Sequence, residues 1–435
     1  MNYPDALSYV HSLYRFGSRL GLERIRTLLE MAGNPHQDMK FVHVAGTNGK
    51  GSTVAMIASI LRSAGLRVGC FISPYLERFT ERIVVSGREI PEEAVADLVS
   101  RLRPLAERMG REGEHPTEFE FVTAMGFLYF KEQQVDVVCL EVGLGGRFDA
   151  TNAIERPLVS VITSVGFDHT DRLGDTLEQI AFEKAGIIKP GCPVVSAPQP
   201  QAALAVLREV AAKRGSPLTL VGEDVRWTIV SHSWKGLVID VAIDGRRYED
   251  LYVRLPGAHQ AVNATAAVAA LEVLRERGLT VGPEHIRRGL REVKWPGRLE
   301  VLSRQPYIVL DGAHNQDGAR ALAAALRELF PGRRVTLVLG LLRDRPALRF
   351  LRYVQPVVDE LIVTKPLSPR ALDPEVLAVH AGGLGLSVQV VPDLRKALLR
   401  ARSLCEPSGV LCVSGSLYLV GPARTILREL GVFHE

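Results

Sequence analysis

One short stretch near residue 50 constrains the fold of this chain more than any other. An apolar run over residues 42–45 leads into the turn Gly46-Thr47-Asn48-Gly49-Lys50-Gly51-Ser52, and a helix is predicted from residue 53. In a strand, turn and helix of this kind, backbone N–H groups and the helix N-terminus converge on one point, which favours a bound phosphate. The glycines let the backbone approach the phosphate oxygens without an intervening Cβ. The stretch therefore predicts an α/β protein that binds a nucleotide.

Two kinds of side chain in this turn suit nucleotide chemistry. The ammonium group of Lys50 can neutralise charge on the β- and γ-phosphates, and the hydroxyl of Ser52 or Thr53 can face Mg²⁺. The strict phosphate-loop pattern is not met, because position 44 is Val and Gly51 separates Lys50 from Ser52. The alternative is a glycine-rich turn without a ligand. The strand before it and the helix after it favour phosphate.

Composition narrows the class of protein. A length of 435 residues predicts two or three domains, and a net charge of +4 gives no support for nucleic-acid binding. No apolar run approaches the roughly 20 residues needed to cross a bilayer. The five cysteines form no C-x-x-C pair, as in a protein with reduced thiols. We expect a cytoplasmic monomer that acts on small molecules, with no nucleic-acid or membrane partner.

Polar residues follow the apolar segments that are predicted to be parallel strands. Residues 135–140 lead to Glu141, and residues 158–163 lead to Asp168-His169. Ligands of open α/β sheets bind beyond the carboxyl ends of the strands, so these side chains are expected near the phosphate turn. A carboxylate and an imidazole there can hold Mg²⁺. Each has a plainer interpretation, a solvated surface Glu and a satisfied polar His, and Mg²⁺ prefers oxygen ligands.

Three other segments complete the first half. Lys184 closes a predicted helix, where its charge complements the helix dipole, and the residues alone favour this structural interpretation. Residues 225–254 alternate as strands and predict a small antiparallel insertion. Asn263 lies near the start of an alanine-rich helix over residues 259–275, and either contacts a ligand or forms part of the first turn; the latter is favoured by sequence alone.

A domain boundary is predicted at Lys294-Trp295-Pro296-Gly297-Arg298, where Pro-Gly interrupts the pattern. Beyond it, strands and helices alternate, which predicts a second, smaller doubly wound domain. Its strands also end in polar or small residues, including Asp311-Gly312-Ala313-His314-Asn315. Two such domains with their strand ends facing one cleft suit a reaction that joins a nucleotide to two other substrates.

Taken together, these motifs resemble the folylpolyglutamate synthase and dihydrofolate synthase family of the Mur ligase superfamily. The resemblance runs from about residue 5 to the C-terminus, and it rests on motifs that occur in order: the phosphate turn, Ser73-Pro74, Glu141-Val142-Gly143-Leu144-Gly145-Gly146-Arg147, Asp149-Ala150-Thr151-Asn152, Asp168-His169-Thr170, Glu183-Lys184-Ala185-Gly186, Pro296-Gly297-Arg298 and Asp311-Gly312-Ala313-His314-Asn315. It implies a parallel-sheet ATPase domain with a small antiparallel insertion over residues 1–295. A smaller Rossmann-like α/β domain would cover residues 299–435.

The resemblance also implies roles for individual residues. The ATP-binding set would be Gly46, Thr47, Asn48, Gly49, Lys50, Gly51, Ser52, Asn263, Arg298 and Asp311. Mg²⁺ would be held by Ser52, Ser73, Glu141 and His169, with Ser73 and Glu141 on one ion and His169 on a second. Lys184 would be carbamylated in support of the metal site, against the helix-dipole interpretation above. Lys50, Lys184 and His314 would be catalytic, and Thr117, Glu118, Phe148, Asp149 and Ala150 would bind the pterin end of the substrate.

The implied activity is an ATP-dependent ligase that joins L-glutamate to the carboxylate of dihydropteroate, of a folate, or of both, through an acyl phosphate. The chain departs from the family at Glu118, where an aromatic residue is usual, at Gln316, and at Arg345-Pro346. Two alternatives remain. One is a Mur-type amino-acid ligase with another carboxylate acceptor, and the other is a non-catalytic nucleotide-binding regulator, against which Glu141, His169 and Lys184 argue.

Overall fold

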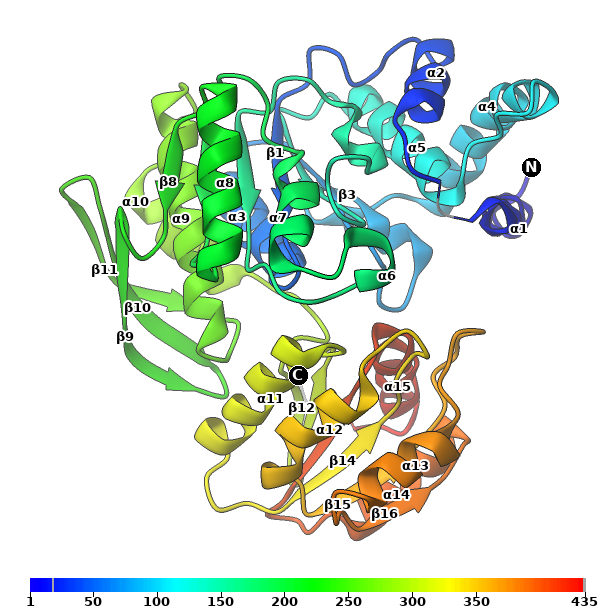
Figure 1. Cartoon of the computed structure of the whole chain (residues 1–435), viewed down its shortest axis with the longest axis vertical. Helices are drawn as coiled ribbons and strands as arrows, with labels where there is room; N and C mark the ends of the chain where they lie inside the picture. The colour runs from blue at the N-terminus through cyan, green and yellow to red at the C-terminus, as the bar shows by residue number, and fades with distance from the viewer. Residues whose placement is uncertain (18, 433–435) are drawn as a thin grey trace.

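The computed structural model describes residues 1–17 and 19–432. A large α/β unit with a small antiparallel sheet at its side occupies the upper part of Figure 1, and a second α/β unit, yellow to red, lies below it. This arrangement confirms the predicted fold class. None of the helices in the described residues is both long and apolar enough to span a bilayer.

The larger sheet has the strand order β4-β3-β2-β5-β1-β6-β7-β8. Its pairs are parallel from β2 through β5, β1, β6 and β7 to β8, whereas β3 runs antiparallel to both of its neighbours. The strands are β1 (Phe41–Ala45), β2 (Val68–Phe71), β3 (Ile83–Val85), β4 (Arg88–Glu89), β5 (Val137–Glu141), β6 (Val159–Ile162), β7 (Val194–Ser196) and β8 (Leu218–Leu220).

Both faces of this sheet are covered, which explains the apolar runs. In β1, Val42 and Val44 pack into the core beneath α3 and α9, while Phe41 faces the core beneath α2 and α5. Such alternation follows from the period of two in a strand, and burial on both sides requires both sets to be apolar. The covering helices are α1 (Tyr3–Ser12), η1 (Leu13–Phe16), α2 (Glu23–Met31), α3 (Lys50–Ser63), α4 (Glu92–Arg111), α5 (Glu118–Glu132), α7 (Leu177–Ala185), α8 (Gln201–Arg214), α9 (His259–Glu276) and α10 (Pro283–Glu292).

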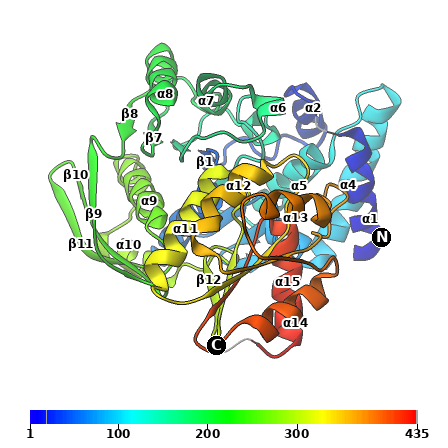
Figure 2. The same cartoon turned by 60° about the horizontal axis from the view of Figure 1, so that its bottom comes forward.

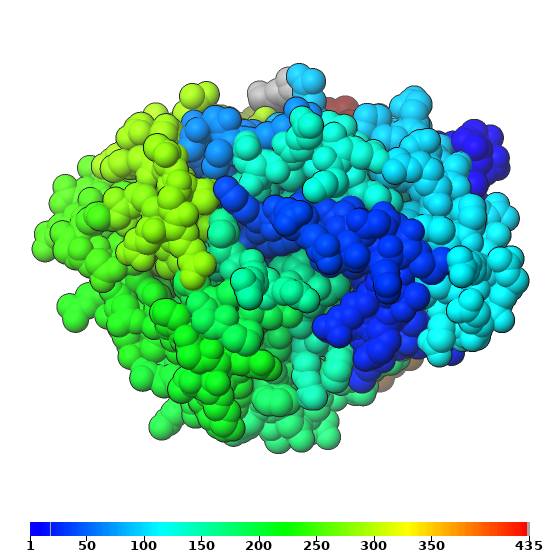
Figure 3. Space-filling view, turned by 90° about the horizontal axis from the view of Figure 1, so that it is seen from above, coloured from blue at the N-terminus to red at the C-terminus, as the bar shows by residue number. Residues whose placement is uncertain are grey.

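The short elements η2 (Phe79–Arg82), η3 (Ala150–Ala153) and α6 (Thr170–Leu173) belong to the connections at the strand ends. Figure 3 shows the blue N-terminal segment lying across the surface of this unit, beside the cyan segments that contain α4 and α5.

The predicted insertion is a three-stranded antiparallel sheet of β9 (Val225–Ser233), β10 (Gly236–Ile243) and β11 (Arg246–Val253). The turn between β9 and β10 reaches the second α/β unit, where the Trp234 ring lies edge-on to Tyr307, with 6.0 Å between the ring centroids. The insertion therefore contacts the second unit directly, in addition to the covalent linker between the units.

The smaller sheet has the order β12-β13-β17-β14-β15-β16. Its first strand, β12, pairs antiparallel with β13, so the sheet is mixed, and this edge strand was not predicted. Its elements are β12 (Glu300–Arg304), β13 (Tyr307–Asp311), α11 (Gln316–Leu329), β14 (Val335–Leu339), α12 (Ala347–Val354), η4 (Gln355–Val357), β15 (Glu360–Val363), α13 (Pro374–Gly382), β16 (Val388–Val390), α14 (Leu394–Leu404), β17 (Val410–Ser414) and α15 (Leu417–Glu429). In Figure 2 the second unit comes forward, and α11 and α12, in yellow, are drawn in front of the larger unit.

Candidate active site between the two α/β units

The phosphate turn joins the central strand β1 to α3. The helix begins at Lys50, three residues earlier than the sequence predicted, with Gly49 in the left-handed region at φ +91° as its N-cap. The Lys50 Nζ donates to the carbonyls of Gly46 and Thr47, at 3.1 and 3.2 Å. The ammonium group is thus folded back over the turn, next to the N–H groups that would face a phosphate.

Neighbouring elements hold the turn in place. The Thr47 hydroxyl donates to the carbonyl of Gly166 at 3.0 Å, and the Thr47 N–H donates to the carbonyl of Ser164 at 2.8 Å. The Ser52 hydroxyl is buried and accepts a hydrogen bond from the Gln260 side chain at 3.4 Å. The turn is therefore fixed against the end of β6 and the start of α9.

Asn263 is helical but does not lie in the first turn, which the sequence alone favoured. It lies in the second turn of a helix that begins at His259, and its amide donates to Gln260 at 2.9 Å. Its oxygen also faces the phosphate turn, since a Cβ on Gly49 would lie only 2.4 Å from Asn263 Oδ1. Asn263 is thus a helical residue whose side chain lies against the phosphate turn.

This close approach leads to a testable expectation for Gly49→Ala. The left-handed conformation costs an L-residue about 1–2 kcal/mol, and the new Cβ would also displace Asn263 from the turn. We expect ADP to bind at least about 10-fold more weakly, which calorimetry would measure. Gly65→Ala is the matched control, because Gly65 has φ +85° and nothing within 4 Å of an added Cβ. Equal ADP affinities in the two variants would contradict the expectation.

Glu141 ends β5, directly beside β1, and is buried. Its Oε2 accepts the backbone N–H of Ser73 at 3.3 Å. Burial raises the pKa of this carboxyl, while the charges of Lys50 and Arg298 act in the opposite direction. A buried carboxylate beside two cations and a phosphate turn has the character of a metal or nucleotide ligand rather than of a solvated surface group.

Lys184 lies in the last turn of α7, as the sequence predicted, and its side chain is buried. Its Nζ donates to the carbonyl of Gly46 at 2.9 Å, which brings it to the back of the phosphate turn. Burial and the nearby charge of Lys50 lower the pKa of Lys184 to about 7. A substantial fraction of this amine is therefore uncharged, and nucleophilic, at neutral pH.

Asp168 forms a cluster that joins the two units. Its carboxylate accepts from the Asn315 amide at 3.0 Å, lies 3.6 Å from His314 Nε2, and forms an ion pair with Arg345. Burial would raise the pKa of Asp168, but the hydrogen bond and charge of His314, with the charge of Arg345, bring it well below its usual value. Asn315 also exchanges hydrogen bonds with Asn48 of the phosphate turn, at 3.0 and 3.2 Å. The strand ends of both units thus meet at one site.

The predicted metal ligands do not all come together. Glu141 and the Ser73 and Ser52 hydroxyls provide oxygen donors that fit Mg²⁺. His169 differs, because its Nε2 lies 3.2 Å from an Arg345 nitrogen and thus faces a cation. In the described part of the chain, no three His, Cys, Asp or Glu side chains converge as a metal site. A metal ion held jointly by one carboxylate, hydroxyls and nucleotide phosphates agrees with this donor set.

The segments predicted to bind the pterin end lie close together. The Phe119 ring packs against Gly143, where a Cβ would lie 2.6 Å from the ring, so the start of α5 adjoins the loop that carries Phe148. Thr117 caps α5, and its hydroxyl accepts the N–H of Glu120 at 3.3 Å. Glu118 lies 4.0 Å from Arg82.

Asp149 and Ala150 have local structural roles as well. The Asp149 carboxylate is buried and accepts from the N–H of Leu144 at 2.9 Å and from the N–H and hydroxyl of Thr151, at 3.0 and 2.6 Å. Ala150 is buried in the core beneath α5. Asp149 therefore holds the loop that presents Phe148.

Arg298 and Asp311 lie at the boundary of the second unit. Asp311 accepts the N–H groups of Leu299 and Ala313, both at 2.9 Å, and so fixes the residue after Arg298. His314 is fixed by a contact of its Nδ1 with the carbonyl of Gly312 at 2.8 Å. These short-range bonds explain why the motif residues are spaced as they are.

Sequence reasoning missed several residues of the site. Gln260 contacts Ser52, Trp295 lies against Gly51, and Arg345 contacts Asp168. The sequence could have indicated Gln260, because it lies about one helical turn before Asn263 and therefore on the same face of the predicted helix. Arg345 was noted in the sequence only as a departure from the family pattern, and its contact with Asp168 depends on how the two units pack.

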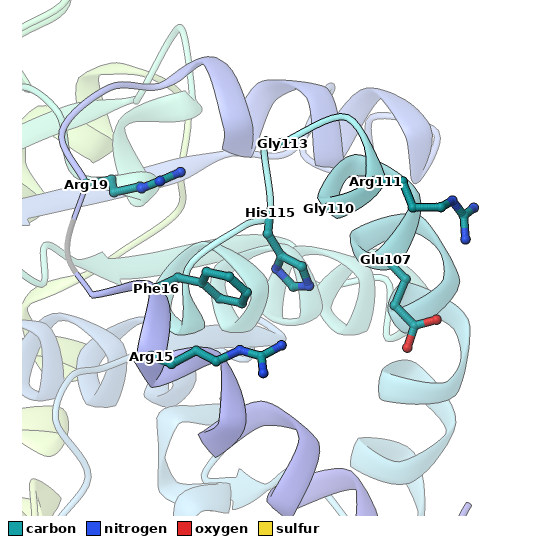
Figure 4. Close-up of a pocket in the computed structure, with 8 residues that line it drawn as sticks. All are labelled: Arg15, Phe16, Arg19, Glu107, Gly110, Arg111, Gly113 and His115. Carbon is teal, nitrogen blue, oxygen red and sulfur yellow. The ribbon is translucent and has the colours of Figure 1, made fainter.

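A surface cavity of about 430 Å³ contains none of the predicted site residues. Figure 4 shows it between the stacked rings of Phe16 and His115 and the end of α4, with Arg15, Arg19 and Arg111 around it. The site described above adjoins a larger cavity, of about 620 Å³, which Ser73, Glu141 and Arg298 help to line.

Comparison with known proteins agrees with this geometry. The "Mur ligase middle domain" family matches residues 44–271, and the "Mur ligase, glutamate ligase domain" family matches residues 297–417. The fold and the site therefore define the chain as an ATP-dependent acid–amino-acid ligase of the Mur type.

Similar proteins narrow this class. The chain is 37% identical to the dihydrofolate synthase/folylpolyglutamate synthase of Bacillus subtilis, over 98% of this chain and 99% of that protein. It is 40% identical to the folylpolyglutamate synthase of Lacticaseibacillus casei, over the same shares. The structure of E. coli FolC in complex with DHPP and ADP superposes with a TM-score of 0.87, 32% identity and 98% coverage of each chain. The chain belongs to the folylpolyglutamate synthase and dihydrofolate synthase family.

Proposed function

We propose that this chain uses ATP to join the α-amine of L-glutamate to the carboxylate of dihydropteroate, of a folate, or of both. The observation that carries the proposal is the meeting of the phosphate turn, the buried Glu141 and the Asp168–His314–Asn315 cluster between the two units. Residues 1–295 would supply the ATP site, and residues 299–435 would close over it.

The chemistry begins with an unreactive carboxylate. Transfer of the γ-phosphoryl group of ATP to the acceptor carboxylate forms an acyl phosphate and releases ADP. The α-amine of glutamate then attacks the acyl carbon, and the tetrahedral intermediate expels phosphate as the amide forms. Phosphoryl transfer depends on positioning and on charge neutralisation, which Lys50 and Arg298 can supply.

The residues around the turn have separate roles in this proposal. Ser73, Glu141 and Ser52 would hold Mg²⁺, which supplies charge neutralisation for the phosphates when it is bound. A carbamate on Lys184 would add a carboxylate beside Gly46, and the uncharged fraction of this amine can react with CO₂. His314 and Asn315, anchored on Asp168, would close the site against water, which would otherwise hydrolyse the acyl phosphate.

The choice of acceptor depends on the pocket around Glu118. The names of the two relatives above differ in the activity that they state. The Bacillus subtilis protein is named dihydrofolate synthase/folylpolyglutamate synthase, and the Lacticaseibacillus casei protein is named folylpolyglutamate synthase alone. Glu118 places a carboxylate where the family usually has an aromatic ring, and Arg82 is its nearby cation.

ADP release with ATP, Mg²⁺ and L-glutamate tests the function, with dihydropteroate and tetrahydrofolate compared and products identified by mass. We expect glutamate-dependent turnover with tetrahydrofolate. Turnover with dihydropteroate as well would assign both activities, whereas its absence would point to Glu118, and Glu118→Phe should then increase dihydropteroate use. If neither acceptor supports ADP release, the folate assignment is overturned in favour of a Mur-type ligase with another acceptor.

A further inference from the structure

The loop that carries Ser73, here called the Ser73 loop (residues 73–82), is held together by its own hydrogen bonds. The Glu81 carboxylate accepts the N–H groups of Leu76, Glu77 and Arg78, at 2.7, 3.1 and 3.0 Å. The N–H of Ile72 donates to the carbonyl of Arg82 at 3.0 Å and closes the base of the loop. Because the loop is internally bonded, a displacement at one end is transmitted to Ser73 at the other.

Glu77 extends from this loop into the second unit. Its carboxylate accepts from Arg424 at 2.5 Å and from the hydroxyl of Thr425 at 2.7 Å, and Arg428 lies at 3.2 Å, all on α15. The side chains of Glu77 and Arg424 are only 7% and 15% exposed. A largely desolvated pair with several hydrogen bonds fixes geometry far more firmly than an exposed ion pair does.

Arg424 also has a second carboxylate partner, Glu300 at the start of β12. Its Nε and a terminal nitrogen donate to Glu300 at 3.0 and 2.9 Å. Glu300 in turn accepts the N–H of Gly297 at 2.9 Å, next to Arg298. One guanidinium group therefore connects the linker that carries Arg298 with the loop that carries Ser73.

Helix α15 packs closely against the Ser73 loop. A Cβ on Gly421 of α15 would lie 1.8 Å from the carbonyl oxygen of Leu76, so only glycine lets the helix contact the Ser73 loop this closely. Ser73, Glu141, Arg298, Glu77 and Arg424 line the same cavity of about 620 Å³. The connection is thus part of the wall of the active-site cavity.

We propose that Arg424 is a positioning residue that couples the nucleotide side of the site to its metal side. By holding Glu77 and Glu300 together, Arg424 places the Ser73 loop against Glu141 only when α15 is docked on the first unit. Nucleotide contact through Arg298 and metal binding at Ser73 and Glu141 are then favoured in the same arrangement of the two units. The inference rests on the metal role proposed for Ser73 and Glu141.

Glu77→Gln is the gentlest test, because Arg424 keeps Glu300 as a partner and no buried charge is left alone. ADP affinity is measured by calorimetry with and without Mg²⁺. In the unaltered protein Mg²⁺ should strengthen ADP binding, and in Glu77→Gln this gain should fall about 10-fold, the loss expected for one charge-assisted hydrogen bond. ADP affinity without Mg²⁺ should stay close to that of the unaltered protein, whereas the melting temperature should fall, because Glu77 loses the charge that its three donors face in a desolvated contact.

Hydrogen–deuterium exchange provides a second measurement, which reports on the Ser73 loop directly. The N–H of Ser73, which donates to Glu141, should exchange with deuterium faster in Glu77→Gln. In an Arg424→Gln background, Glu77→Gln should have no further effect on either readout beyond about twofold, because the two residues act as one unit. Arg395→Gln is the matched control, since it removes an exposed ion pair with Glu429 between α14 and α15, within the second unit.

Two results would overturn the proposal: an Mg²⁺ dependence of ADP binding that is the same in Glu77→Gln as in the unaltered protein, or no Mg²⁺ dependence in either. Independent, multiplicative effects of the Glu77 and Arg424 substitutions would also overturn it. ADP binding needs no acceptor, so a failure of the folate assignment would show only as absent turnover, with the coupling intact.

Discussion

Replacing Lys50 with Met is expected to lower kcat by about 10³-fold, the order of magnitude found when a preorganised group that stabilises transition-state charge is removed. The Lys50 ammonium lies over the phosphate turn, 3.1 Å from the carbonyl of Gly46, and Met keeps a similar length without the charge. Charge that develops on the transferred phosphoryl oxygens would lose one of the cations that neutralise it. Steady-state ADP release at saturating ATP and glutamate measures the effect.

Lys189→Met is the matched control for this substitution. The Lys189 Nζ also donates to a backbone carbonyl, that of Asn152 at 3.1 Å, which lies outside the phosphate turn. We expect its kcat to stay within a few-fold of the unaltered enzyme. A loss confined to KM in Lys50→Met, with kcat unchanged, would mean that Lys50 binds ATP equally in the ground and transition states and would refute the proposed role.

Lys184→Ala is expected to lower kcat by about 10²-fold or more, because it removes the amine that would carry the carbamate, a preorganised charge in the site. In the proposed modification the uncharged amine would attack CO₂: an N–C bond forms as one C–O π bond becomes the carbamate oxyanion, and the nitrogen loses a proton to solvent. Acetate can occupy the space left by the shortened side chain, so added acetate should restore part of the activity. Rescue by acetate, but not by an equal concentration of chloride, distinguishes a missing carboxylate from a general loss of structure.

The pH dependence follows from the lowered pKa of Lys184, about 7. Above pH 7 the amine is mainly uncharged and can react with CO₂, so CO₂-depleted enzyme should regain activity quickly on addition of bicarbonate. Below pH 7 the amine is protonated, and reactivation should slow as the pH falls. Full activity in the absence of CO₂ at every pH would contradict carbamylation.

The free energy of unfolding, measured in CO₂-free buffer, should also depend on pH because of the lowered pKa of Lys184. Between pH 7 and the ordinary lysine value of 10.5, the unfolded chain binds a proton at Lys184 that the folded chain does not. The contribution of this residue to the free energy of unfolding therefore rises with pH through that window. The dependence should be flatter in Lys184→Ala, as measured by denaturant unfolding at several pH values.

Local sequence patterns were sufficient to predict most of the strands and helices. The buried parallel strands appeared as continuous apolar runs because both faces of the sheet are covered, and the insertion appeared as alternation because its strands are partly exposed. β12 was missed because its burial is only partial and its pairing with β13 is a long-range feature. The start of α3 was placed three residues late because a glycine-rich turn conceals the first helical residues.

The chemistry of single residues was harder to derive than the elements. Lys184 illustrates the difficulty, since a lysine in the last turn of a helix is usually a dipole partner, and the sequence did not show that its amine is buried against Gly46. Glu141 and His169 were treated alike because both follow buried strands. The structure separates them, with Glu141 beside Ser73 and His169 beside Arg345.

The α/β class, the phosphate turn and the family resemblance could be inferred from the sequence, because each rests on motifs whose own residues are close together along the chain. Tertiary structure alone decided that Asn48 meets Asn315, that Arg345 faces His169, and that Arg424 joins Glu77 to Glu300. Asn48–Asn315, Arg345–His169 and Arg424–Glu77 each join residues from the two α/β units. Their geometry is set by how the two units pack, and no local propensity or periodicity encodes that packing.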